Sequence, residues 1–127
     1  MQSWPSRWAF GSALAGVLAS VGASTGAPAA DAKRGELLFQ TCAACHSILG
    51  DGIGPDIRHI FGAKAASQPG FRYSEAMKTS GLVWDEPTLR KFVSQPQSLV
   101  KGTAMAFPGY AREADVDDVI EFLKNQK

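Results

Sequence analysis

The chain has 127 residues, 45% of them hydrophobic, and its 13 Lys and Arg against 12 Asp and Glu give a formal net charge of +1. This length supports one small domain. The chain is nearly neutral and has no polybasic cluster, so its charge does not indicate nucleic acid or an anionic lipid surface as a partner. Its two cysteines are too few for a disulfide framework that would compensate for a small core.

Residues 1–30 have the pattern of a secretory signal peptide. Arg7 supplies a positive charge, an apolar run extends from Trp8 to Val21, and small residues follow it. We expect cleavage near Ala29 or Ala30, which would leave a domain of residues 31–127 in the periplasm. The alternative is an uncleaved membrane anchor, because the apolar run is close to the shortest length that spans a bilayer.

Helices separated by long loops are expected in the rest of the chain, and no segment shows the alternation of a β-strand. The first helix should extend from about residue 32 to 44. Residues 47–74 contain glycine and proline at short intervals, so we predict a long irregular segment there. A loop of this length in a small domain usually wraps something.

The second half of the chain predicts a short helical turn at residues 74–79 and a longer helix that begins after Asp85, a good N-cap, and ends before Pro96. Residues 95–110 are expected to form a second loop. The last helix should extend from about Glu113 to Asn125, with acidic residues at its start that suit the helix dipole. Its apolar stripe consists of Val116, Val119, Ile120 and Leu123.

Residues 41–47, T-C-A-A-C-H-S, contain both cysteines and one of the two histidines. In an exported chain, C-x-x-C-H indicates covalent attachment of haem. On a turn that ends a helix, Cys42 and Cys45 can each add to one vinyl group of the porphyrin. His46, next to the second thioether, would then lie beneath the iron as its axial ligand.

Three other interpretations of this motif are weaker. A thioredoxin-like dithiol expects a βαβ surrounding, which the predicted helices and loops lack. A zinc site would be one ligand short, because His59 is the only other histidine. A disulfide between Cys42 and Cys45 would close too small a loop to stabilise much.

A low-spin electron carrier needs a sixth iron ligand, and a methionine thioether raises the potential by favouring the reduced state. The two candidates are Met77 and Met105. Met77 lies in a helical turn, where methionine usually fills core space. Met105 lies in the glycine-flanked loop K-G-T-A-M-A-F-P-G, which can bring a side chain to a buried metal, and we favour it.

Residues 35–123 resemble the bacterial class I c-type cytochromes and their mitochondrial cytochrome c relatives. The resemblance rests on C-A-A-C-H, G-P-D-I-R-H-I-F-G, P-G-F-R-Y-S-E-A-M, G-L-V-W-D-E-P-T-L, K-G-T-A-M-A-F-P-G and V-I-E-F-L-K, in that order. It implies an all-α fold, with about four helices and long loops around one haem c. It also implies a monomeric electron carrier without enzymatic activity, which meets donor and acceptor proteins and reaches membranes only through them.

The resemblance also assigns roles to residues. The carbonyl of Pro55 would accept a hydrogen bond from the axial histidine, a contact that orients the ring and makes the ligand more basic. Tyr73 and Trp84 match residues that hydrogen-bond a haem propionate, and Phe107 matches the aromatic ring over the exposed haem edge. Gly35 and Phe39 would form a close helix crossing against Phe122. His59 matches no ligand position of the family and is expected to face solvent or support a loop.

Four positions depart from the family pattern. Ala63 replaces an arginine near a propionate, Met77 a frequent asparagine, Phe92 a tyrosine near the methionine sulfur, and Lys101 a proline of the ligand loop. If that loop opens, a haem-based sensor or a peroxidase-like protein is the alternative function. The positions where mitochondrial relatives carry lysines around the haem edge are mostly uncharged here: they include Thr41, Gln97, Ala104 and Ala111, with Arg112 as the main remaining cation.

Overall fold

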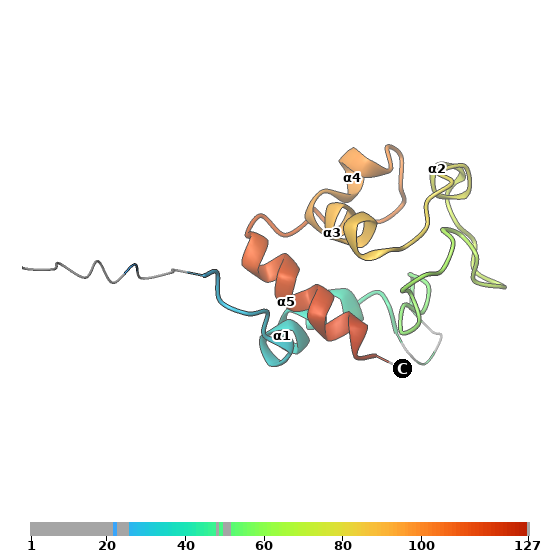
Figure 1. Cartoon of the computed structure of the whole chain (residues 1–127). Helices are drawn as coiled ribbons and strands as arrows, with labels where there is room; N and C mark the ends of the chain where they lie inside the picture. The colour runs from blue at the N-terminus through green and yellow to red at the C-terminus, as the bar shows by residue number, and fades with distance from the viewer. Residues whose placement is uncertain (1–21, 23–25, 48, 50–51, 127) are drawn as a thin grey trace, which may run out of the picture.

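A computed structural model describes residues 22, 26–47, 49 and 52–126, and in these residues the fold is helical (Figure 1). The helices are α1 (Ala32–Ala43), α2 (Glu75–Lys78), α3 (Glu86–Ser94), α4 (Pro96–Leu99) and α5 (Glu113–Lys124). The only strand-like pairing among the described residues is one isolated bridge between Lys64 and Val83. The predicted all-α class and the positions of α1, α2, α3 and α5 are therefore confirmed.

Of the 30 residues of the predicted signal peptide, 24 (residues 1–21 and 23–25) lie outside the described residues. The signal and its cleavage near Ala29 or Ala30 stay predictions. Within the described ranges, no helix is long and apolar enough to cross a membrane.

Helices α1 and α5 cross each other (Figure 1), and Gly35 lies at their contact. A Cβ atom added to Gly35 would lie 2.0 Å from the Asp118 backbone oxygen and 2.9 Å from Phe122 Cβ, so the two backbones approach as closely as only glycine allows. Beside this point the rings of Phe39 and Phe122 are 5.0 Å apart. The close crossing predicted from the resemblance is thus present.

A polar network that sequence reasoning missed also joins these two helices. The guanidinium of Arg34 donates to the carboxylates of Asp115 and Asp118, and the backbone N–H of Asp31 donates to Asp118 Oδ1 at 2.7 Å. These carboxylates raise the pKa of Arg34 above its ordinary value. Asp118 is 5% exposed, so it binds the two helices together rather than only complementing the dipole of α5.

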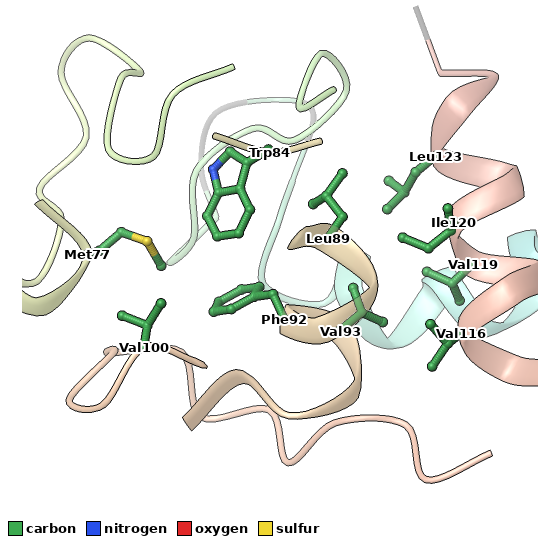
Figure 2. Close-up of a cluster of buried hydrophobic side chains, with 10 residues drawn as sticks. All are labelled: Met77, Trp84, Leu89, Phe92, Val93, Val100, Val116, Val119, Ile120 and Leu123. Carbon is green, nitrogen blue, oxygen red and sulfur yellow. The ribbon is translucent and has the colours of Figure 1, made fainter. Parts of the chain in front are cut away.

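The core lies between α3 and α5 and continues on the side of α3 away from α5, where Met77, Trp84, Phe92 and Val100 lie (Figure 2). The predicted stripe of α5 is buried: Val116, Val119, Ile120 and Leu123 are at most 4% exposed. Helix α3 begins as expected, because the Asp85 carboxylate accepts a hydrogen bond from Thr88 N at 2.8 Å.

Helix α4 corrects the prediction of a continuous loop over residues 95–110. Pro96 was interpreted only as the end of the preceding helix, but it also occupies the first turn of a new one, where its missing N–H costs no hydrogen bond. Val100 N donates to Pro96 O at 3.0 Å, and Pro96 and Val100 are both buried. The segment that carries Met105 therefore starts from an anchored turn.

Candidate functional site

One cavity of about 720 Å³ is lined by all eight residues to which the sequence gave a role at the haem: Cys42, Cys45, His46, Pro55, Tyr73, Trp84, Met105 and Phe107. Its volume lies within the range of roughly 300–1,000 Å³ that is typical of ligand and cofactor sites. The core residues Leu89, Val93 and Val119 form part of the same wall, so the cavity continues the hydrophobic interior.

The cysteine motif forms a tight turn at the end of α1. Cys45 N and His46 N both donate to Cys42 O, at 3.0 and 2.8 Å. Both cysteines are free thiols, and burial raises the pKa of the Cys42 thiol. The turn thus presents two sulfur atoms and one imidazole to the same cavity.

The ring of His46 is held from two sides. Its Nδ1 lies 2.6 Å from the backbone oxygen of Pro55, and a Cβ atom on Gly54 would approach the ring to 2.7 Å. A carbonyl oxygen only accepts hydrogen bonds, so Nδ1 must carry a proton, and in the neutral ring Nε2 then keeps its lone pair. This is the tautomer that a metal ligand requires, and Gly54 N, which donates to Cys45 O at 2.9 Å, fixes the loop against the turn.

Met105 lies far from the cysteine motif in the sequence, in the loop between α4 and α5. Its N–H donates to Thr103 Oγ1 at 3.3 Å, and its carbonyl accepts a hydrogen bond from Gln97 Nε2 at 2.6 Å. Gly102 has a φ of +87°, a left-handed conformation that turns the chain here at no steric cost. The sequence predicts Gln97 only as a surface position. Its hydrogen bond to the Met105 carbonyl could not be predicted, because such a bond leaves no local sequence pattern.

The remaining cavity wall is aromatic and polar. The ring of Trp84 is 5.0 Å from that of Phe92, and Tyr73 OH accepts a hydrogen bond from Gln68 N at 3.3 Å. Trp84 is positioned by backbone bonds with the long loop, as its N–H donates to Ala63 O at 2.8 Å. Lys64 and Arg72 are exposed and line the cavity, so cations are present here although position 63 is alanine.

Tyr110 is a further residue that sequence reasoning missed. Its hydroxyl donates to Leu38 O on α1 at 2.7 Å, and its ring packs edge-on against Phe107 at 5.0 Å. Burial raises the pKa of this hydroxyl, which therefore stays protonated as a donor. Tyr110 links the end of the methionine loop to α1, the helix that carries Cys42.

Two other sequence interpretations can be placed. His59 is exposed and borders the cavity, so it faces solvent as expected. Met77 is 9% exposed and reaches the cavity from α2, among Trp84, Phe92 and Val100 (Figure 2). In the described part of the chain, no three His, Cys, Asp or Glu residues are grouped to hold a metal ion.

A family model described as cytochrome c matches residues 32–127. The chain belongs to the cytochrome c family. The cytochrome c2 of Rhodomicrobium vannielii is 46% identical to it over 101 residues, which are 77% of this chain and 81% of that protein. The cytochrome c of Stellaria longipes is 41% identical over 100 residues, 75% of this chain and 92% of that protein. Among solved structures, cytochrome cH from Methylobacterium extorquens matches with a TM-score of 0.71 and 42% identity, over 74% of this chain and 97% of that chain.

As a class I c-type cytochrome, the chain is an electron-transfer protein with one covalently attached haem c, as its motifs predicted. The residues present fit this group. The cavity is mainly apolar, two free thiols lie on one turn at its wall, and an imidazole with a free Nε2 stands beside them. A thioether lines the same cavity from a separate loop, so a fifth and a sixth ligand for an iron are both available.

Proposed function

We propose that this cytochrome c is a soluble periplasmic carrier of single electrons between redox partner proteins. Cys42 and Cys45 would hold the haem as thioethers, and His46 and Met105 would be the axial ligands of a low-spin iron. The observation that carries this proposal is the geometry of His46, whose Nδ1 lies 2.6 Å from Pro55 O, so that Nε2 is the nitrogen left to coordinate a metal, in a residue that lines the same cavity as Met105. When bound, the haem supplies a one-electron change at its iron.

The chain's own contribution is to keep both ligands in place and water out. Pro55 and Gly54 hold the imidazole ring, and Thr103 and Gln97 hold the backbone of Met105 on both sides. Because these contacts are formed within the protein, gaining an electron requires little rearrangement. Tyr73 and Trp84 would bind the propionate, and Phe107 would cover the edge through which electrons pass.

The positions that match the lysines of mitochondrial relatives are mostly uncharged on this surface. Thr41, Ala104, Ala111 and Gln97 are exposed, and the exposed cations beside them are Lys101 and Arg112, the latter 72% exposed in its side chain. We therefore expect donor and acceptor proteins to dock mainly through neutral contacts, with no membrane binding of the carrier itself.

Export is the second part of the proposal. The mass of the purified, exported protein should correspond to cleavage near Ala29 or Ala30 plus one haem. A full-length mass in a membrane fraction would instead support the anchor.

Absorption spectroscopy tests the ligand assignment. The oxidised protein, produced with a haem-maturation system, should show low-spin bands and the weak far-red absorption of a sulfur–iron bond. Met105→Ala should abolish the far-red absorption, whereas Met77→Ala, which removes the other thioether of the cavity, should retain it. High-spin bands in the unmodified protein, or loss of the far-red absorption only in Met77→Ala, would overturn the assignment.

The sensor or peroxidase-like alternative requires an open methionine loop. It predicts that the unmodified protein binds small external ligands readily and lacks the far-red absorption. The hydrogen bonds at Met105 favour the carrier over this alternative.

A further inference from the structure

The methionine loop, residues 101–109, is held by few hydrogen bonds. Among the described residues, they are Thr103 N to Val100 O at 3.0 Å, Met105 N to Thr103 Oγ1 at 3.3 Å, and two bonds from the side chain of Gln97. Gln97 Nε2 donates to Met105 O at 2.6 Å and reaches Thr103 O at 3.5 Å. One exposed side chain thus supplies half of the hydrogen bonds of this loop.

We propose that Gln97 is a positioning residue that keeps Met105 at its place in the cavity and thereby closes the site to external ligands. This inference rests on the proposed ligation by Met105. It assigns the closure to the backbone carbonyl of the loop rather than to a contact with the sulfur atom.

The chemistry of the contact supports this role. Both partners of the Gln97 amide are carbonyl oxygens, so the nitrogen of the amide must face them. Gln97 belongs to α4, a single helical turn that is anchored at its start by Pro96, fully buried, and just after its end by Val100, 3% exposed. A donor on an anchored turn therefore restrains the loop that carries its acceptors.

Among the described residues, no side chain other than that of Gln97 donates a hydrogen bond to a carbonyl oxygen of this loop. Phe92 and Met77, both buried on the cavity wall, carry no hydrogen-bond donor. Closure of the loop is therefore expected to depend on hydrogen bonds to its backbone, of which the bond from Gln97 to Met105 O is the shortest.

The magnitude follows from the strength of an exposed hydrogen bond. Such a bond changes an equilibrium constant by a factor of roughly 2–10. The apparent affinity for an external ligand is proportional to the fraction of molecules with an open loop. Loss of the bond should therefore raise the affinity for imidazole by the same factor.

The test uses Gln97→Glu in the haem-loaded protein, with imidazole as the probe. Glutamate has nearly the same shape, but a carboxylate cannot donate to the two carbonyl oxygens and is repelled by them. The matched control is Gln95→Glu, the same charge change two residues away, at a position whose side chain makes no capping hydrogen bond. Gln97→Arg returns a donor and should restore closure.

We expect Gln97→Glu to bind imidazole about 2–10-fold more tightly than the unmodified protein, with the equilibrium constant of global unfolding raised by no more than about the same factor. Gln95→Glu and Gln97→Arg should bind imidazole as the unmodified protein does. Equal imidazole affinity in Gln97→Glu and Gln95→Glu would overturn the inference while leaving ligation by Met105 intact. Absence of the far-red absorption in the unmodified protein would instead refute that ligation, and the role of Gln97 with it.

Discussion

Replacement of Gly35 by alanine tests the close crossing of α1 and α5. The added Cβ would lie 2.0 Å from the Asp118 backbone oxygen and 2.6 Å from the carbon of the same carbonyl. Non-bonded atoms prefer a separation of about 3.5–4.0 Å, so the methyl group would be about 1.5 Å too close. The obstructing atoms belong to the backbone of α5, and they cannot move aside as the end of a flexible side chain could.

The helices must therefore separate, and the cost can be estimated. Overpacking of this kind destabilises by about 1–3 kcal/mol, and a weakened Phe39–Phe122 contact, now at 5.0 Å, adds up to about 1 kcal/mol. The higher helix propensity of alanine returns about 1 kcal/mol. We expect Gly35→Ala to lower the free energy of unfolding by about 2 kcal/mol.

Urea unfolding of the haem-loaded protein, followed by far-ultraviolet circular dichroism, measures this change. Glu36→Ala is the control, because Glu36 is the next residue of α1 and is exposed, so its substitution should change stability by less than about 0.5 kcal/mol. If Gly35→Ala were as stable as Glu36→Ala, the two backbones could not be in such close contact.

Three further predictions concern charge. Ala63→Arg should raise the midpoint potential by some tens of millivolts in a redox titration, because a cation at the cavity wall favours the reduced form; an unchanged or lower potential with an intact fold would contradict this. Association with a redox partner, measured by stopped-flow, should slow less than tenfold between low and physiological salt, and a steep fall would mean that the docking face is charged. The Arg58 guanidinium lowers the pKa of Asp56 below its ordinary value of about 3.9, so the stabilisation from this pair is present above that pH and is lost as the pH falls through the lowered pKa. In thermal melts, Asp56→Asn should accordingly be less stable than the unmodified protein at pH 6, and it should lose less stability than the unmodified protein when the pH is lowered from 6 to 3. If both proteins lost the same stability between pH 6 and pH 3, this pair would be excluded as a source of acid sensitivity.

Local patterns were sufficient for most of the helices. The apolar stripe of α5 and the N-cap of α3 are encoded within a few residues, because helix periodicity and capping act over three or four positions. Helix α4 escaped prediction because Pro96 can end one helix and begin another, and only the packing of Pro96 and Val100 into the core decides between the two.

The amino-acid sequence by itself determined the attached group, because C-A-A-C-H, an export pattern and the family resemblance all point to haem c. It also named eight residues that the folded chain brings to one cavity. Only the tertiary structure revealed what holds that cavity together: Arg34 with Asp118, 84 residues apart, Tyr110 with Leu38, 72 residues apart, and Gln97 with the carbonyl of Met105. These contacts join segments that are brought together only when the chain folds, and two of the three acceptors are backbone carbonyls, which every residue possesses. For that reason no pattern in the sequence marks them.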